Sequence, residues 1–435
     1  MEDVGAVEPV GGQPVNGSAA STVKGAASHD SQESTWSKEK KHFFILSSAG
    51  KPVYARYGEE ADVSSYLGVA QAIISSFESS GDQIRCLNAG RHRFVFLNRN
   101  PLYLVVVSHT GESEAQLRSQ LSLLYNQLLS IMTAPQITRL YSKRINFDLR
   151  RFLAGTDNLF DSLVDSLSSC SSMELKSIRC ARLEAPVRSA ITQALKSCRI
   201  KDIRYAAVFV NGRIASYSQP RSHPLHPFDL QILSNMVHTS TKYGAGETWT
   251  PLCLPRWNHT AFVNVYVNHL SPNVCVVALA RDKDAFFALS AYQTKLTQVK
   301  SALRAYCYAC LTSAVVASVA DIGIPGLRHC MFRSTQSKQI AIAEPITYNE
   351  GDQQRLFGLY QHASGLLHAR SAPIMVHYHT TATETLMAWS SASFELYAVF
   401  GPFISKSSVI TAVNTLIRWI QKAEDALFVS RPLLF

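Results

Sequence analysis

Two kinds of side chain in this 435-residue sequence could do chemistry by type and spacing, and the first is a cysteine pair. Cys307 and Cys310 form the only Cys-x-x-Cys, a spacing used by zinc sites and by redox enzymes. A zinc site needs two further ligands at a matching spacing, and the sequence has none. A redox pair begins a helix, whereas this pair falls late in an apolar helical stripe. The pattern therefore favours two core cysteines.

Histidine pairs are the second kind, and they could ligate a metal ion. His223 and His226 lie in a proline-rich loop before an expected helix, and His377 and His379 share one face of an expected strand. No carboxylate or third ligand has a motif-like spacing. We therefore predict no metal and no cofactor. A metal-dependent hydrolase is the most distant alternative, and stoichiometric metal in the purified protein would revive it.

The motifs of common catalytic folds are absent from the sequence. It contains no P-loop and no Gly-x-Gly-x-x-Gly after a strand, which argues against an NTPase or a dinucleotide enzyme. It also lacks the Gly-x-Ser-x-Gly elbow, His-Glu-x-x-His and the kinase signatures. No catalytic residue is therefore predicted.

Charge is unevenly distributed along the chain. The formal net charge is +10, yet the first 35 residues carry one base and five acids, so the remainder is strongly basic. Such a surface favours anionic lipid, an acidic protein or nucleic acid as a partner. No nucleic-acid-binding module matches, so a solvated face, acidic headgroups or a protein partner are favoured over nucleic acid. The basic clusters are Lys38–Lys41, Arg91–Arg93, Lys143–Arg144 and Arg150–Arg151.

Cysteine usage and the first residues indicate a reducing, cytoplasmic compartment. The nine cysteines are dispersed and odd in number, so no disulfide framework is predicted. Residues 1–34 lack the basic and apolar regions of a signal peptide, and their polar composition is typical of disorder. The apolar stretch Ala305–Ala320 is short for a membrane span and contains polar residues, so we expect a buried helix end.

The elements that must position these side chains follow one order three times. In the first copy a hairpin leads to an amphipathic helix, three more strands follow, and a second helix ends the unit. A capping box of Ser113 and Gln116 is expected to begin that second helix. The apolar stripe of the first helix is Val63, Leu67, Ala70, Ile74 and Phe77. The expected strands are 42–47, 52–57, 84–88, 92–98 and 102–108.

The same order begins again near Arg204 and near Arg328. The second hairpin turns at Asn211-Gly212, a strong two-residue turn signal. The hairpin and the first helix start about 22, 23 and 24 residues apart in the three copies (42 to 64, 204 to 227 and 329 to 353), which favours structural repetition. Residues 133–199 fall between copies, and their pattern predicts helices that extend the first unit toward the second.

The predicted fold class is α/β (α+β), with three longin/roadblock-like modules, each a five-stranded antiparallel meander with helices on its faces. We divide the chain into a disordered tail at 1–37, a first module with its helical extension at 38–199, a second module at 200–322 and a third at 323–435.

One segment also carries a family resemblance. The run Lys-His-Phe-Phe-Ile-Leu-Ser-Ser-Ala-Gly-Lys-Pro-Val-Tyr-Ala-Arg-Tyr-Gly-Glu-Glu at 41–60 closely resembles the opening longin segment of the SAND (vacuolar-fusion Mon) family. Weaker similarity continues through Asn88–Phe96, Leu102–Val107, Leu123–Leu128 and Pro135–Ile137. The resemblance covers essentially everything after the tail.

The resemblance implies a heterodimer with a Ccz-type longin subunit. That complex would act as a guanine-nucleotide exchange factor for the Rab GTPase of late endosomes and vacuoles, recruited peripherally to membranes of late endosomes, multivesicular bodies and vacuoles or lysosomes. It would promote endosome maturation and fusion with the vacuole or lysosome. Exchange makes no covalent bond, which is compatible with the missing catalytic motifs. The alternative is a longin adaptor or tether scaffold that binds a GTPase and membrane without activating the GTPase.

The expected exchange surface is the first module's hairpin, Ser48–Tyr57, with the helix over Ser64–Phe77, and it would be shared with the partner's equivalent elements. Its expected anchors for the GTPase are Lys51, Tyr54, Arg56 and Tyr57. Tyr54 and Tyr57 could equally be sheet core. The second and third modules would pair with the partner's counterparts, and their basic surface could reach an anionic phosphoinositide membrane, an attraction that salt would weaken.

Overall fold

A computed structural model describes most of the chain after its first 38 residues. It covers 39–57, 60–169, 177–197, 203–242, 247–271, 273–280, 317–344, 348–369, 371–429 and 433–434. All described helices and strands belong to one compact unit, Lys40–Phe435. The predicted tail and the apolar helical stripe that contains Cys307 and Cys310 lie outside the described residues.

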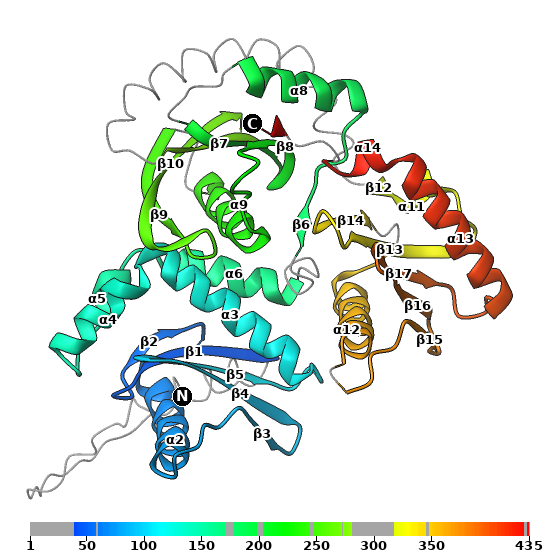
Figure 1. Ribbon diagram of the computed structural model, residues 1–435. Helices are drawn as coiled ribbons and strands as arrows, with labels where there is room; N and C mark the ends of the chain where they lie inside the picture. The colour runs from blue at the N-terminus through cyan, green and yellow to red at the C-terminus, as the bar shows by residue number, and fades with distance from the viewer. Residues whose placement is uncertain are drawn as a thin grey trace, which may run out of the picture. The chain divides into compact units, whose positions relative to one another are not determined.

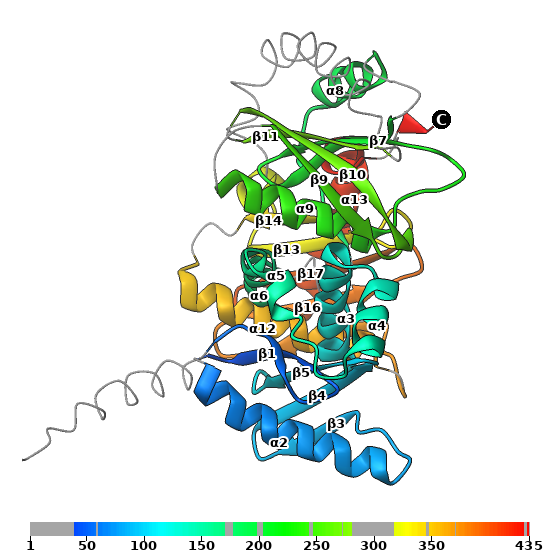
Figure 2. The same ribbon diagram turned by 90° about the vertical axis from the view of Figure 1, so that its left-hand side faces the viewer.

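The first sheet contains five antiparallel strands in the order β2-β1-β5-β4-β3. Figure 1 shows helices α2 and α3 on its opposite faces, and Figure 2 shows the same arrangement from the side. Because both faces are covered, β1 is a continuous buried run instead of an alternating one. The elements are β1 (Lys41–Ser47), β2 (Pro52–Ala55), α2 (Glu60–Ser79), β3 (Cys86–Ala89), β4 (His92–Arg99), β5 (Leu102–Ser108) and α3 (Glu114–Ile131).

The second sheet repeats this order as β8-β7-β11-β10-β9, with β18 added beside β8. Alternate residues of β7 enter two cores: Val208 packs with α8, and Phe209 packs with α9. The predicted turn is confirmed, because Asn211 and Gly212 have φ angles of 49° and 71°, as a type I′ turn requires. The elements are α8 (Ala185–Ser197), β7 (Ile203–Val210), β8 (Arg213–Gln219), α9 (Pro227–Lys242), β9 (Glu247–Leu254), β10 (Asn258–Ser271), β11 (Val274–Ala280) and β18 (Leu433–Leu434).

The third sheet has the core order β14-β13-β17-β16-β15. Leu396 belongs to the core beneath α13, and its neighbour Tyr397 belongs to the core beneath α12. The elements are β13 (Leu327–Ser334), β14 (Gln339–Glu344), α12 (Glu350–Leu367), β15 (Val376–Thr380), β16 (Thr385–Ser390), β17 (Phe394–Phe400), α13 (Lys406–Lys422) and α14 (Glu424–Leu427).

Short parallel strands extend the edge at β14. They are β12 (Ala317–Ser318) and β6 (Ile178–Arg179), and helix α11 (Val319–Ile322) follows β12. The sequence placed Ala317 and Ser318 in a buried helix end, and this was wrong for both residues. Ser318 instead caps α11 by accepting a hydrogen bond from the backbone N–H of Ala320. The earlier part of that predicted helix, 305–316, lies outside the described residues.

Helices fill the connection after α3, as the sequence predicted. They are α4 (Ala134–Lys143), α5 (Arg150–Leu153), α6 (Asp157–Ser169) and α8, which covers one face of the second sheet.

The three sheets share one order, with the last strand beside the first. Consecutive strands three to five form the meander, and the helix after strand two carries the chain to the far edge of the sheet. The predicted fold class is confirmed. The capping box at Ser113 and Gln116 is also present at the start of α3.

Candidate functional site

The candidate site begins at the β1–β2 hairpin of the first module. Its turn closes with a hydrogen bond from the backbone N–H of Ser47 to the carbonyl of Lys51, at 2.9 Å. Gly50 has a φ of +76°, and an added Cβ would lie 3.2 Å from Cγ of Gln71 on α2. Gln71 Nε2 also donates to the carbonyl of Ser48 at 3.1 Å. The hairpin tip is therefore fixed against α2, and a glycine is needed at the point of contact.

Of the four predicted anchors, Lys51 and Tyr54 have opposite environments. Lys51 is exposed at the hairpin tip, where its Nζ donates to the carbonyl of Asn146 at 3.0 Å. Tyr54 is 5% exposed, and its ring packs 5.0 Å from that of Phe160. Its hydroxyl donates to Asp161 Oδ1 at 2.7 Å. Burial and this carboxylate raise the pKa of Tyr54 well above its usual value. Tyr54 thus belongs to the core and supports the hairpin from beneath.

Arg56 joins the hairpin to α6 through two carboxylates. Its Nη1 lies 3.2 Å from Asp161 Oδ2, and its Nη2 donates to Asp165 Oδ1 at 2.9 Å. The guanidinium also lies over the ring of Tyr57, 4.9 Å from its centroid. Tyr57 is half-buried and contacts His42 edge-on at 5.9 Å. The charge of Arg56 is therefore largely balanced within the module, whereas that of Lys51 faces a neutral carbonyl.

The structure brings three of the predicted residues, Tyr54, Arg56 and Tyr57, into one cluster. Sequence reasoning missed the two residues that hold this cluster, Asp161 and Asp165. They are more than 100 positions away, and no local motif marks them.

Helix α2 has a second apolar row that the sequence stripe did not identify. Leu67 and Ile74 are buried as predicted, but Phe77 is 41% exposed, so its assignment to the buried stripe was wrong. Tyr66 and Val69 are 53% and 61% exposed. With Ile73 and Phe77 they are spaced by three, four and four residues, which places them on one side of a helix. We call Tyr66, Val69, Ile73 and Phe77 the outer row of α2.

The described part of the chain offers little for covalent chemistry. No group of three or more His, Cys, Asp or Glu residues among the described residues could hold a metal ion. His377 and His379 stack at 5.9 Å on one strand face, as the sequence predicted. His226 acts at the start of α9, where its Nδ1 accepts a hydrogen bond from the backbone N–H of Phe228 at 3.2 Å.

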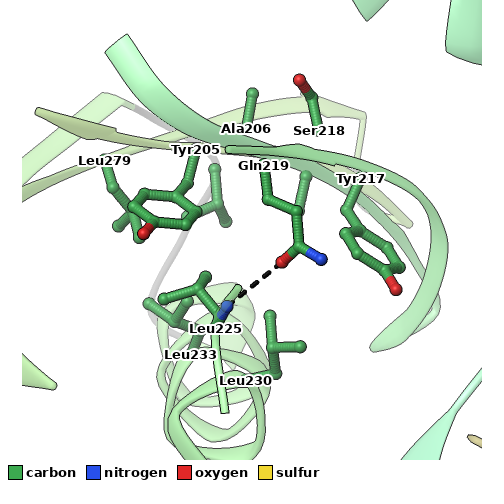
Figure 3. Close-up of a pocket in the computed structure, with 11 residues that line it drawn as sticks. Tyr205, Ala206, Tyr217, Ser218, Gln219, Leu225, Leu230, Leu233 and Leu279 are labelled. Atoms are coloured by element: carbon green, nitrogen blue, oxygen red, sulfur yellow. Dashed lines mark hydrogen bonds between the residues drawn. The ribbon is translucent and has the colours of Figure 1, made fainter. Parts of the chain in front are cut away.

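A pocket between the second sheet and α9 is lined mainly by apolar groups. Figure 3 shows the side chains of Leu225, Leu230 and Leu233 facing the sheet, with Ser218 pointing away from them. Gln219 Oε1 accepts a hydrogen bond from the backbone N–H of Leu225 at 3.1 Å, also drawn in Figure 3. The Tyr205 hydroxyl donates to the carbonyl of His223 at 2.6 Å. The polar groups of this pocket thus hold a loop, and they form no acid–base or nucleophile–base pair.

The described helices include none that is both long enough and apolar enough to cross a membrane.

Three family descriptions match the chain, one for each sheet. Residues 41–163 match the first longin domain of FUZ, MON1 and HPS1, residues 201–298 match the second, and residues 326–424 match the third.

Similarity to curated proteins extends over nearly the whole chain. The vacuolar fusion protein MON1 homolog A of Macaca fascicularis is 34% identical over 429 residues, which is 95% of this chain and 76% of the relative. The protein SAND of Takifugu rubripes is 34% identical, with 93% of this chain and 79% of the relative covered. The vacuolar fusion protein MON1 homolog B of Mus musculus is 36% identical, with 93% and 77% covered.

Proposed function

Because the chain belongs to the MON1/SAND family of vacuolar fusion proteins, we propose that it is one subunit of a heterodimeric guanine-nucleotide exchange factor. Its partner would be a Ccz-type longin subunit, and its target a Rab GTPase of late endosomes and vacuoles. The complex would act from the cytoplasm, recruited peripherally to late endosomes, multivesicular bodies and vacuoles or lysosomes, and would promote their maturation and fusion. The observation that carries this proposal is the family similarity over 95% of the chain.

The mechanism requires a binding surface and no covalent catalyst. An exchange factor accelerates nucleotide release because it binds the nucleotide-free GTPase more tightly than the loaded one. Rigid, preformed elements serve this purpose well, since little binding energy is then lost in ordering them. The hairpin tip, held by Gln71 and by Asn146, is such an element.

We assign the GTPase contact to the hairpin and its flank. Lys51 supplies an exposed positive charge, and Tyr57 with the Arg56 guanidinium stacked on it supplies an aromatic and planar surface. Tyr54 contributes indirectly, because its hydroxyl orients Asp161, which in turn holds Arg56.

The outer row of α2 suits contact with the Ccz-type partner. Its exposed apolar side chains would be covered in a heterodimer, and aromatic residues are enriched at the centres of such interfaces. The second and third modules would pair with the partner's counterparts. The basic excess of the folded part further supports attraction to an anionic, phosphoinositide-bearing membrane.

Release of a fluorescent nucleotide from the Rab tests the proposal with the co-purified complex. We expect release to accelerate with the wild-type complex and to return toward the spontaneous rate with Lys51→Glu. Lys51 is a cleaner position than Arg56, because its ammonium donates to a neutral carbonyl, whereas the Arg56 guanidinium balances two carboxylates. Lys422→Glu, at an exposed position on α13, is the matched control and should exchange normally. Stable Rab binding with no acceleration would instead assign the complex to the adaptor class.

A further inference from the structure

A basic and apolar corner of the first module contains none of the residues assigned above to contact with the GTPase or the Ccz-type partner. It comprises α4 from Arg139, the loop to α5, and α5 up to Phe152, and we call it the α4–α5 corner. Ile145 is 73% exposed and Phe152 is 57% exposed. Five basic side chains and one acidic side chain lie in the same fourteen residues: Arg139, Lys143, Arg144, Arg150 and Arg151, with Asp148.

The corner is held rigidly by other residues. Ile137 and Tyr141 bury one side of α4, and Leu149 and Leu153 anchor α5 in the same core. Phe147 links the two helices, with its ring 6.1 Å from that of Tyr141 and 5.4 Å from that of Phe152. The corner therefore folds without burying Ile145 or the exposed part of Phe152. Because these apolar surfaces stay in water, they contribute little to the stability of the fold.

Positive charges outnumber negative ones in the corner by five to one. Arg139, Lys143, Arg144 and Arg151 are exposed. The single acid, Asp148, lies 3.5 Å from Arg151, whose side chain nevertheless remains 86% exposed. The corner thus presents a net positive surface around two apolar side chains that project into solvent.

This combination matches an anionic bilayer better than a protein. The centres of protein interfaces are depleted of charge, and the charges at their rims are paired. A membrane surface instead attracts basic side chains to its headgroups while adjacent apolar side chains enter the headgroup–acyl boundary. Lysine and arginine can extend their charged ends to the headgroups while their stems follow the apolar residues inward.

We propose that the α4–α5 corner binds anionic membrane, with Ile145 and Phe152 entering the interface and the four exposed basic side chains contacting lipid headgroups. This locates the membrane partner of the proposed function in the first module, whereas the sequence placed membrane contact on the second and third. It rests on the proposed function only for the choice of an anionic membrane as partner. Lys51 donates to the carbonyl of Asn146 inside the corner, so the contact would lie beside the hairpin that we assign to a membrane-attached GTPase.

Vesicle co-sedimentation of the co-purified complex tests the inference. The probes are vesicles of phosphatidylcholine alone and vesicles with about one part in five phosphatidylserine. The wild-type complex should bind the anionic vesicles and dissociate as salt rises from about 0.15 M to about 1 M. Arg144→Ala with Arg151→Ala should weaken binding roughly 30-fold, from about 1 kcal/mol for each basic residue at such a surface. Ile145→Ser with Phe152→Ser should weaken binding strongly, and the binding that remains should keep its salt dependence because the basic side chains are unchanged.

Matched variants and a second readout make the outcome decisive. Phe403→Ser with Ile410→Ser removes two exposed apolar side chains of the third module, 98% and 44% exposed, and should leave vesicle binding unchanged. Nucleotide release in solution, without vesicles, should be unchanged by the corner variants. If these variants bind vesicles like the wild type, or if the third-module variant alone loses binding, the inference is overturned. Loss of nucleotide release in solution would overturn it too, by assigning the corner to a protein contact. Wild-type vesicle binding without any exchange would leave this inference standing and reject the proposed function.

Discussion

A buried carboxylate in the second module predicts an unusual dependence of stability on pH. Asp229, near the start of α9, is fully buried. Its Oδ1 accepts a hydrogen bond from the backbone N–H of Arg256 at 3.1 Å, and its Oδ2 has no partner among the described residues. Burial raises the pKa of Asp229 from its ordinary 3.8 to about 6, although backbone donors of Arg256 and Trp257 oppose the rise.

The size and sign of the effect follow from this shift. A carboxyl group with a raised folded-state pKa binds its proton more tightly when folded, so its contribution to stability is complete below pH 3.8. That contribution is lost as pH rises through the folded pKa of about 6. The shift of about two units corresponds to about 3 kcal/mol. Asp229→Asn stays neutral at every pH and keeps an acceptor for Arg256, so it should not lose this contribution.

Urea unfolding of both proteins across pH, followed by tryptophan fluorescence, measures the effect. Trp257 lies in the turn that Asp229 holds, so fluorescence reports on this region. The free energy of unfolding of the wild type, relative to Asp229→Asn, should fall by roughly 2–3 kcal/mol between about pH 4 and pH 7. A constant difference across this range, or one that favours the wild type more as pH rises, would show that Asp229 does not have a raised pKa in the folded protein.

Three further changes test the first module. Lys41→Met removes the ammonium that lies 2.7 Å from the buried Glu112 carboxylate. The free energy of unfolding in urea should therefore fall by about 3–5 kcal/mol, and adding Glu112→Gln should restore most of it. Gly50→Val should cost more stability than Gly81→Val. Both glycines have positive φ angles, but only a side chain at position 50 would meet another side chain, on α2. Equal losses of about 1–3 kcal/mol would mean that backbone strain alone accounts for the cost. Val69→Glu places a charge in the outer row of α2 and should reduce co-purification of the Ccz-type partner at least tenfold while leaving the melting temperature of the chain unchanged.

The fold was largely predictable because its signals are local. Strand runs, the Asn211-Gly212 turn and the capping box at Ser113 each depend on a few neighbouring residues, and each is present in the structure. The two-residue strands β6, β12 and β18 were not predictable, since each exists only because the edge of another strand lies beside it. Phe77 was misplaced for a related reason. Periodicity identified the buried side of α2 at Leu67 and Ile74, but it cannot show that the packing no longer covers Phe77 near the end of the helix.

The candidate site was predictable only in part. The segment that resembles the family located the hairpin, but it did not show which of the hairpin's residues are exposed. The structure shows that Tyr54 belongs to the core and Lys51 to the surface. The pairing of Arg56 with Asp161 and Asp165 depends on how α6 packs against the hairpin, and the spacing of these residues in the sequence does not predict that packing.

An exchange complex must distinguish two states of its GTPase, and its affinity for each state measures that distinction. Titration of the co-purified heterodimer with nucleotide-free Rab and with GDP-loaded Rab gives the two dissociation constants. We expect much tighter binding of the nucleotide-free form, with most of that preference lost in Lys51→Glu. Equal affinities for the two forms would contradict this expectation, because a ligand that binds two states equally cannot shift the balance between them.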